Sequence, residues 1–485
     1  MIQSGLRKFV VAAFLLCSFV ATAHGAPAPS KPNVVIIVAD DMGFADVGFN
    51  GSKDIKTPNI DRIAAAGAIL DQWYVQPVCS PTRAALMTGR YPMRYGLQTG
   101  VIRPYADYGL SLEERTLAQA LKDAGYETAI SGKWHLGFVK PEYLPTRRGF
   151  DHQYGHYNGQ IDYNDHTRDG GFDWHRDDKV NRDEGYSTQL ISAEAVKRIE
   201  QRDAKRPLFL YVPFNAVHGP HQVPDSYKQP YKDLEEPRQT YAGMMAAMDE
   251  GIGKILDAID AAKMRENTLV LFTSDNGGPQ PGKVTNNGPL KGGKGSLWEG
   301  GVRVAGCIAW PGQIPAGSKV TQPLHVVDIF PTLVKLAGAK EEQKLPLDGR
   351  DAWATITSNA PSPNAEILLN ATPVNGAIRM GDWKLILDDR PGGAPEEEGE
   401  EGGSSARRQA RQQAAAAGDG VAADAKVKLY NLAEDPGEHT DMAAKNPEKV
   451  KELRAAYDKL AAQAVPPKAK PKDPNFKTPE VWGEH

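Results

Sequence analysis

Residues 33–41 read Asn-Val-Val-Ile-Ile-Val-Ala-Asp-Asp, a continuous apolar and β-branched run that ends abruptly in two aspartates. Such a run is typical of a strand buried on both faces of a parallel sheet. Comparable runs recur at 126–130, 207–214 and 268–273. Helical patterns that stop at a glycine lie between them, at 60–66 and 112–124. The first 340 residues are therefore predicted to form an α/β sheet with helices on both faces.

Each of these four runs gives way to polar side chains at its carboxyl end. The polar groups are Asp40-Asp41, Gly132-Lys133-Trp134-His135, Asn215 with His218, and Asp275-Asn276. In open α/β sheets ligands bind beyond the carboxyl ends of the strands, so the four groups are predicted to meet in one site. Asp, Asn and Gly are also ordinary turn residues, which leaves four independent turns as the alternative. Lys and His are not turn formers, and they favour the shared site.

The composition narrows the class of protein. The chain has 485 residues, and 57 Lys and Arg against 61 Asp and Glu give a net charge of −4, which predicts neither a nucleic-acid partner nor a strongly anionic membrane partner. Residues 1–25 have two basic residues, an apolar run and then small residues, the layout of a signal peptide. We expect an exported protein, periplasmic or secreted, with no membrane span in the mature chain. An N-terminal membrane anchor is the alternative.

The cysteines exclude a disulfide framework. Cys17 falls in the predicted signal peptide, which leaves Cys79 and Cys307. Cys307 lies in the apolar run 304–310 and is predicted to be a buried structural thiol.

A large domain is predicted over residues 26–344 and a smaller α+β domain over residues 345–485. The smaller domain is predicted to contain strands at 376–379, 383–387 and 426–432 and a helix at 447–462. Residues 391–425 are of low complexity and are predicted to be a disordered insertion. The tail from Pro466 is expected to lie along the surface.

Cys79 begins the stretch Cys79-Ser80-Pro81-Thr82-Arg83, which precedes a helical pattern. Ser80 is suited to the N-cap position and Pro81 to the first helical position. Cys79 would then lie at a helix N-terminus, which favours an anion, with Arg83 on the same side. A reactive thiol and a buried structural cysteine both remain open at this point.

This stretch, continuing to Thr88-Gly89-Arg90, resembles the signature of the type I sulfatases. Further motifs of that family match in order: Thr57-Pro58-Asn59-Ile60-Asp61, Gly132 to Gly137, Arg148-Gly149-Phe150-Asp151, Asp275 to Gly278, Lys291 to Gly295, Trp298 to Gly301, and Leu429-Tyr430-Asn431-Leu432. The resemblance implies an alkaline-phosphatase-like large domain, with a central mixed, mostly parallel sheet between helices, and the smaller C-terminal α+β domain. It also implies that a maturation enzyme oxidises Cys79 to Cα-formylglycine.

Asp40, Asp41, Asp275 and Asn276 offer only hard oxygen ligands, which suit calcium or magnesium better than zinc. The resemblance implies one calcium ion per site, with residue 79 as a further ligand. It also implies that a hydroxyl of hydrated formylglycine attacks the sulfur of a sulfate ester. The implied roles of the other residues follow: Arg83 holds residue 79, Lys133 and Lys294 contact the sulfuryl oxygens, Lys294 or His218 assists the leaving alcohol, and His135 takes the proton that lets sulfate depart.

The stretches 215–224 and 296–303 are most similar to the arylsulfatase B branch, the N-acetylgalactosamine-4-sulfatases. A sulfated carbohydrate is therefore the expected substrate, although other sulfated small molecules fit as well. The loop 155–178 is dense in aromatic, acidic and basic side chains, which suit sugar recognition, and is a candidate substrate wall, with a polar surface loop as the alternative. Two alternatives remain: a phosphonate monoester hydrolase or phosphodiesterase of the same superfamily, and a catalytically silent glycan-binding protein. The intact Cys79, Lys133, His135 and Lys294 argue against the silent protein.

Overall fold

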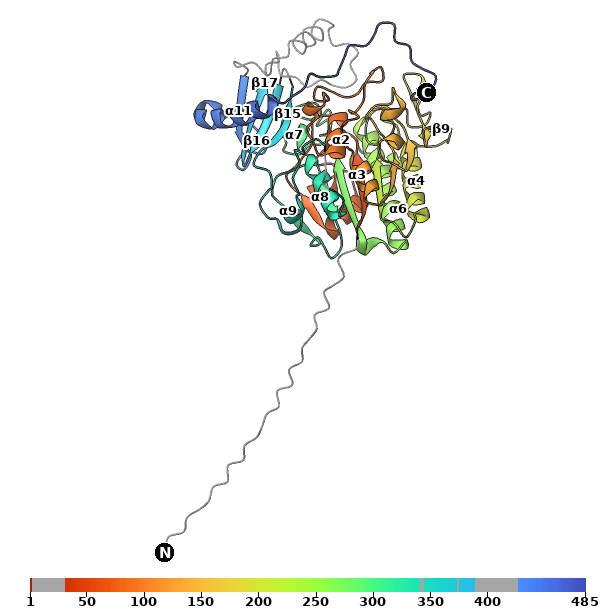
Figure 1. The fold of residues 1–485 in the computed structure, drawn as a ribbon, viewed down its shortest axis with the longest axis horizontal. Coiled ribbons are helices and arrows are strands. Elements are labelled where there is room, and N and C mark those ends of the chain that lie inside the picture. The colour runs from red at the N-terminus through yellow and green to blue at the C-terminus, as the bar shows by residue number, and fades with distance from the viewer. Residues whose placement is uncertain (2–30, 341–343, 373–374, 389–425) are drawn as a thin grey trace. The chain divides into compact units, whose positions relative to one another are not determined.

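The apolar run at residues 33–39 forms β1 (Asn33–Ala39), which lies in the middle of a ten-stranded sheet (Figure 1). The computed structural model describes Met1 and residues 31–340, 344–372, 375–388 and 426–485. The predicted signal peptide and the predicted insertion at 391–425 lie outside the described residues. Lys31–His485 form one unit.

The four strands predicted from the sequence are neighbours in this sheet. They lie in the order β11 (Thr268–Ser274), β1, β10 (Leu208–Pro213) and β4 (Glu127–Ser131), and every neighbouring pair is parallel. The full order is β13-β2-β12-β11-β1-β10-β4-β5-β8-β9, in which β12 (Gly306–Ala309) is antiparallel to β11. The outer strands are β2 (Ala68–Leu70), β5 (His152–Gly155), β8 (His175–Arg176), β9 (Lys179–Val180) and β13 (Ser318–Val320). The predicted central, mixed and mostly parallel sheet is confirmed.

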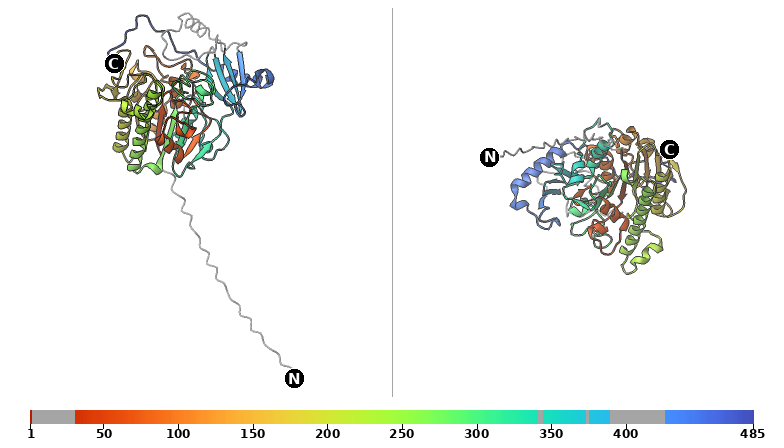
Figure 2. Two further views of the ribbon diagram at one scale, coloured as in Figure 1. Left: turned by 180° about the vertical axis from the view of Figure 1, so that it is seen from behind. Right: turned by 90° about the horizontal axis from the view of Figure 1, so that it is seen from below.

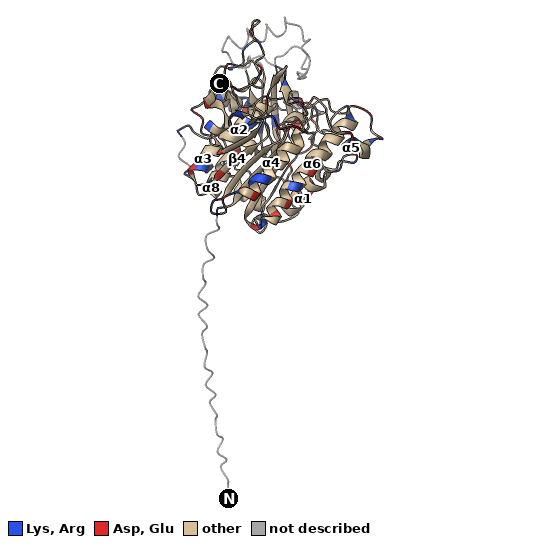
Figure 3. Ribbon diagram, turned by 90° about the vertical axis from the view of Figure 1, so that its right-hand side faces the viewer, with Lys and Arg blue, Asp and Glu red and all other residues tan. Residues whose placement is uncertain are grey.

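Alternate residues of β1 enter two separate cores. Val34, Ile36 and Val38 pack in the core that includes α2 (Cys79–Thr88), α3 (Leu117–Asp123) and α8 (Ile329–Leu336). Val35 and Ile37 pack in the core that includes α1 (Pro58–Ala66), α4 (Ser187–Gln201) and α6 (Arg238–Ala261). Figure 3 shows α3 and α4 on opposite sides of β4. The helix predicted at 112–124 begins later, at Leu117, because Thr116 and Gln119 form a capping box that fixes its start.

The C-terminal part of the chain forms a separate four-stranded antiparallel sheet. Its strands are β15 (Ile367–Ala371), β16 (Asn375–Met380), β17 (Trp383–Asp388) and β18 (Lys426–Asn431), in that order. The helix α11 (Pro447–Ala461) packs on this sheet through Leu453 and Tyr457 (Figures 1 and 2). The predicted smaller α+β arrangement is confirmed, whereas its boundary after residue 344 stays a prediction.

Lys384 of β17 is fully buried between two carboxylates. Its Nζ lies 2.9 Å from Glu299 of α7 (Glu299–Val302) and 2.9 Å from Glu438, which follows β18. The Glu438 carboxylate also accepts a hydrogen bond of 2.6 Å from the backbone N–H of Glu299. Lys384, Glu299 and Glu438 thus form a charged cluster that links the small sheet to α7. Lys291, in the loop before α7, adds a hydrogen bond to the backbone oxygen of Glu438 (3.1 Å).

The tail from Pro466 lies along the surface as predicted, and its end is anchored. Lys468 N–H donates to Gly96 O (2.8 Å), and the segment reaches Phe172, whose N–H donates to Glu480 O (2.8 Å). Trp482 is 2% exposed, packs on Phe138 and donates through Nε1 to Arg168 O (2.8 Å). Across the described part of the chain, no helix has the length and apolar character needed to cross a bilayer.

Candidate active site

The four strand ends bring their polar residues together at one edge of the central sheet. Asp40 and Asp41 follow β1, Lys133 and His135 follow β4, His218 follows β10, and Asp275 and Asn276 follow β11. All of these residues are buried, none more than 7% exposed. The single site predicted from the sequence is thus formed by the parallel core of the sheet.

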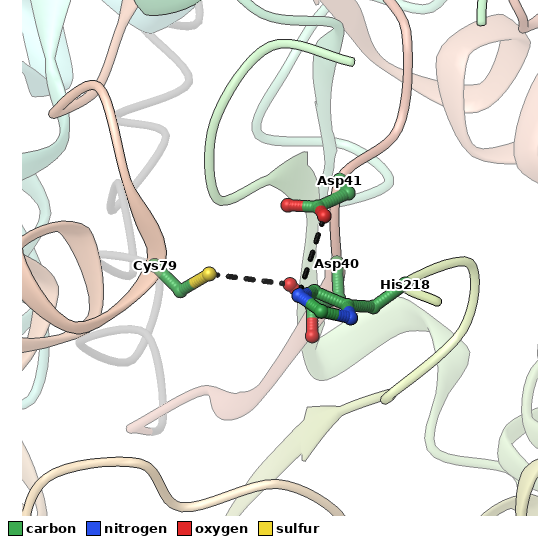
Figure 4. A group of neighbouring side chains, drawn as sticks. All are labelled: Asp40, Asp41, Cys79 and His218. Atoms are coloured by element: carbon green, nitrogen blue, oxygen red, sulfur yellow. Dashed lines mark hydrogen bonds and ion pairs between the residues drawn. The ribbon is translucent and has the colours of Figure 1, made fainter. Parts of the chain in front are cut away.

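Cys79 is the first residue of α2, and its Sγ lies 3.6 Å from Asp40 Oδ1 (Figure 4). The prediction that Ser80 is the N-cap is wrong: Val78, with extended backbone, occupies that position. The Ser80 Oγ accepts a hydrogen bond from the N–H of Ile102 instead (3.0 Å), so a tertiary contact outcompetes local capping. Burial raises the pKa of the Cys79 thiol well above its ordinary value, which disfavours a reactive thiolate.

Arg83 lies one turn further along α2 and holds two strand ends together. Its Nε and Nη2 donate to Asp275 Oδ2 at 3.0 and 2.7 Å, and its Nη1 donates to Lys133 O at 3.2 Å. The ion pair is fully buried, where a fork of charged hydrogen bonds fixes geometry well. The direct partner of Arg83 is therefore Asp275, rather than residue 79 itself.

Two lysines and a histidine surround the aspartates that follow β1. Lys133 Nζ lies 2.5 Å from Asp40 Oδ2, and Lys294 Nζ lies 2.9 Å from Asp41 Oδ2. His218 Nε2 is 3.2 Å from Lys294 Nζ and 3.5 Å from Asp41 Oδ2. Burial alone would raise the pKa of Asp40, but Lys133, His218 and Arg83 hold it well below its usual range. The site is thus a buried cluster of alternating charges.

His135 follows Lys133 in the same loop after β4. Its backbone has a φ of 55°, in the left-handed region, and its N–H donates to Tyr157 O (3.1 Å). The ring Nε2 lies 3.1 Å from Ile102 O. Because Ile102 also contacts Ser80, His135 and the start of α2 share one neighbour.

The donor set fits a hard cation. Asp40, Asp41, Cys79 and His218 each offer a ligand atom within 4.8 Å of the others, and the two carboxylates are the hard oxygen donors of this group. The Asn276 side chain donates through Nδ2 to Asp41 Oδ1 (2.8 Å), while its buried Oδ1 accepts no hydrogen bond from the described residues. A buried oxygen without a donor is costly unless a cation satisfies it, and amide and carboxylate oxygens suit calcium or magnesium. Asp275 adjoins this group, since Asp41 N–H donates to its Oδ1 (3.3 Å).

The aromatic rings of the loop 155–178 do not form the exposed substrate wall that the composition predicted, and a role for the loop's charged side chains stays a prediction. The rings of Tyr157, Tyr163, His166, Trp174 and His175 are at most 1% exposed. The Tyr163 hydroxyl donates to the backbone oxygens of Asn215 and His218, at 2.7 Å each. The rings are buried because the loop folds over the site's own backbone, so they support catalytic residues rather than face solvent. Sequence reasoning also missed Gly159 and Asp173 in this region, because only the fold reveals that Gly159 adjoins the His135 ring and that Asp173 binds the backbone of Tyr157 and Asn158.

Comparison with known proteins agrees with this geometry. The family model described as Sulfatase matches residues 32–339. Arylsulfatase J of Mus musculus is 35% identical, with 95% of this chain and 81% of that protein covered. N-acetylgalactosamine-6-sulfatase of Mus musculus is 36% identical over 68% of this chain and 67% of its own. The crystal structure of Ps i-CgsB in complex with k-i-k-neocarrahexaose has a TM-score of 0.78 and 33% identity, and covers 90% of this chain and 94% of that one.

Proposed function

The chain belongs to the sulfatase family and is a sulfuric ester hydrolase, and we propose that its substrate is a sulfate monoester of a carbohydrate. We further propose that the reaction uses formylglycine made from Cys79 and one calcium ion per site. The observation that carries this proposal is the position of Cys79 Sγ, 3.6 Å from Asp40, within a buried cluster of oxygen ligands and cationic side chains. The resemblance of the stretches around Cys79 and around the strand ends to the family's motifs supports it.

Asp40, Asp41, Asp275 and Asn276 would hold the calcium ion, with residue 79 as a further ligand. When bound, the ion supplies positive charge for the sulfuryl oxygens and lowers the proton affinity of a hydroxyl beside it. Formylglycine at position 79 supplies, as its hydrate, one hydroxyl that can attack sulfur and a second whose deprotonation allows sulfate to leave. Arg83 keeps the Asp275 carboxylate in place through two hydrogen bonds.

The cationic side chains stabilise the charge that develops on the sulfuryl group. Lys133 and Lys294 each place an ammonium group at one of the two aspartates that follow β1, so both lie at the reacting centre. Preorganised charges of this kind are most effective in a buried site, where water does not screen them. We assign both lysines to contacts with the sulfuryl oxygens.

The attacking hydroxyl gives up its proton as its oxygen bonds to sulfur, and the neighbouring Asp40 carboxylate, 3.6 Å from Cys79 Sγ, is the candidate acceptor. Two further proton transfers follow. The departing alcohol needs a proton, and Lys294 and His218, whose nitrogen atoms are 3.2 Å apart, are the available donors. His135 accepts the proton from the second hydroxyl of residue 79, the carbon–oxygen bond to the sulfate group breaks as the aldehyde C=O forms, and water then rehydrates the aldehyde. In this scheme the alcohol leaves in a first step and sulfate in a second step, with a different proton-transfer group in each.

The substrate class rests on the relatives. One relative is an N-acetylgalactosamine-6-sulfatase and one related structure holds neocarrahexaose, which favours a sulfated carbohydrate over a simple aryl sulfate. We propose the same class for this chain, while the narrower resemblance to the N-acetylgalactosamine-4-sulfatases stays a prediction. Export to the periplasm or the medium and the action of a formylglycine-generating enzyme also belong to the proposal.

The test is a comparison of substrates on matured protein. We expect the purified protein, with formylglycine verified by peptide mass spectrometry, to hydrolyse an aryl sulfate faster than the matched aryl phosphonate. A screen of sulfated oligosaccharides should then give at least one substrate with a higher kcat/KM than the aryl sulfate. Faster phosphonate hydrolysis would favour the phosphonate monoester hydrolase alternative. Glycan binding without turnover by fully matured protein would favour a silent binding protein.

A further inference from the structure

The ring of His135 rests against residues 156–159. Besides the hydrogen bond from His135 N–H to Tyr157 O, a Cβ placed on Gly159 would lie only 2.3 Å from His135 Cε1 and 2.4 Å from its Nε2. His156 O accepts a further hydrogen bond from Trp134 N–H (2.9 Å). Because His135 has left-handed backbone, which is uncommon for a residue with a side chain, its position depends on these neighbours.

Asp173 fixes the position of residues 156–159. It follows β7 (Gly171–Phe172) and is fully buried. Its Oδ1 accepts from Tyr157 N–H (2.9 Å), and its Oδ2 accepts from Asn158 N–H (2.8 Å) and Asn158 Nδ2 (2.9 Å). His175 Nδ1 lies 3.4 Å from Oδ1, and the His175 ring stacks on Tyr157 at 4.2 Å. One carboxylate thus binds two consecutive backbone amides of the segment that supports His135.

We propose that Asp173 is a positioning residue for His135, acting through the backbone of Tyr157 and Asn158. This inference rests on the proposed function, in which His135 serves only the second step. Among the described residues, the Asp173 carboxylate contacts Tyr157, Asn158 and His175 and none of the residues assigned to the metal, so we expect its effect to fall on His135. Burying a carboxylate costs free energy unless hydrogen bonds compensate for it. The Asp173 carboxylate receives these hydrogen bonds from Tyr157 and Asn158, in the segment that supports the His135 ring.

The decisive variant is Asp173→Asn, which keeps the shape of the side chain. One of its two terminal atoms becomes an NH₂ group, which cannot accept a hydrogen bond, so at least one backbone amide of the segment loses its partner. We expect the segment to shift and His135 to move with it. Misplacement of a catalytic group by about 1 Å costs on the order of 100-fold in rate. Sulfate release should therefore slow by about that factor, while the first turnover of alcohol release is retained as a burst.

The chain contains a closely matched control. Asp249 of α6 is 2% exposed and accepts from the N–H groups of Asn59 (3.1 Å) and Ile60 (2.8 Å), and from Asn59 Nδ2 (2.9 Å). This is the same pattern of two consecutive backbone amides and one asparagine side chain, located at the start of α1. Asp249→Asn should lower stability in a similar way but leave turnover per matured, metal-loaded site within about two-fold of wild type.

A second measurement follows His135 without any substrate. Protein labelled with ¹³C at the Cε1 of histidine gives one signal per ring, and the His135 signal is assigned by its absence in His135→Ala. We expect Asp173→Asn to shift that signal and Asp249→Asn to leave it in place. Gly159→Ala, which places a methyl group against the same ring, should also shift it, and this variant serves if Asp173→Asn does not fold.

The outcomes separate the two hypotheses. A shifted His135 signal, a retained burst and slow sulfate release in Asp173→Asn, with none of these changes in Asp249→Asn, support the positioning role. An unshifted His135 signal, or equal losses in both aspartate variants, overturns it. If wild-type protein releases neither alcohol nor sulfate from any ester, the proposed function fails, whereas the His135 signal still decides the role of Asp173.

Discussion

Lys294 Nζ lies 3.2 Å from His218 Nε2, and both groups contact the Asp41 carboxylate. The ammonium group and the imidazole come from different strand-end loops and meet on one side of the site. Because they adjoin each other, the charge of one affects the protonation of the other. The pair is therefore suited to supply both the positive charge for a sulfuryl oxygen and the proton for the leaving alcohol.

Lys294→Ala should lower kcat/KM by about 100- to 1000-fold, the usual cost of removing one stabilising donor from a preorganised site. The loss should be greater for alcohols that leave poorly, because these need the most help with their negative charge. Steady-state rates with a series of aryl sulfates of rising phenol pKa measure this dependence. The same loss for every leaving group would restrict Lys294 to binding the sulfuryl oxygens.

His135→Ala should slow sulfate release more than alcohol release. The reason is that His135 is assigned to the second step only, and loss of a general base costs about 100- to 10,000-fold. With an activated aryl sulfate we expect a burst of phenol close to one per matured site, followed by slow turnover. Separate assays of phenol and sulfate over time test this. A fully matured and metal-loaded variant that shows no burst would place His135 in the first step.

Active protein should carry formylglycine at position 79. Mass spectrometry of the peptide that contains this residue distinguishes the aldehyde from the unmodified thiol. We expect specific activity to rise in proportion to the modified fraction across preparations made with different amounts of maturation enzyme. Full activity in a preparation that holds only the thiol would contradict the nucleophile assignment.

Chelation should abolish turnover, and calcium should restore it. The expectation follows from three carboxylates and the Asn276 Oδ1, which form a hard oxygen set. Titration of chelated protein with calcium, magnesium and zinc, with activity and thermal stability as readouts, checks it. Asn276→Ala should raise the calcium concentration needed for half-maximal stabilisation. Restoration by zinc alone would show that the ligand set has been assigned wrongly.

Glu438→Gln should stabilise the protein at pH 8 but not at pH 5. Burial and the negative charge of the nearby Glu299 raise the pKa of Glu438 from an ordinary value of 4.5 to about 7, although the positive charge of Lys384 lowers it. Between pH 4.5 and about pH 7, Glu438 keeps its proton in the folded state but has lost it in the unfolded state. The free energy of unfolding therefore falls as the pH rises through this range. The shift corresponds to about 3 kcal/mol in the free energy of unfolding.

The measurement is denaturant unfolding of wild type and Glu438→Gln at both pH values. The other charged groups of this cluster, Glu299, Lys384, Arg379 and Arg303, are present in both proteins, so the difference isolates Glu438. An effect of the substitution that is independent of pH would mean that Glu438 is ionised in the folded protein at pH 5 as well.

The centre of the fold could be predicted because its signals are local. The runs at 33–39, 207–214 and 268–273 are mostly apolar and β-branched, as buried parallel strands require, whereas the run at 126–130 is shorter and includes Glu127 and Thr128. Polar residues mark where each strand ends. The convergence of Asp40, Lys133, His218 and Asp275 then follows from the rule for ligand sites in such sheets. Here the local pattern and the global fold agree.

The remaining features depend on contacts between distant residues. Ser80 has the right character for an N-cap, but Ile102 occupies its hydroxyl. The aromatic residues of 155–178 have the composition of a sugar-binding surface. Their burial is evident only in the fold, in which Tyr157 stacks on His175 and the Tyr163 hydroxyl bonds to the backbone of His218. Asp173 and Asp249 look equally ordinary in the sequence. What distinguishes Asp173 is the ring that lies beyond the segment it binds.

The complete burial of Cys79 constrains the order of events during biosynthesis. Cys79 is 0% exposed and α2 is buried along its whole length, so a second protein cannot enclose this side chain in the folded molecule as a small ester could approach it. An enzyme that oxidises this side chain must therefore reach it while the chain is still unfolded, in competition with the formation of the central sheet. Under the proposed formylglycine mechanism, host cells with too little of that enzyme would yield folded but inactive molecules. Treating such a preparation after purification would not rescue it unless the protein were first unfolded.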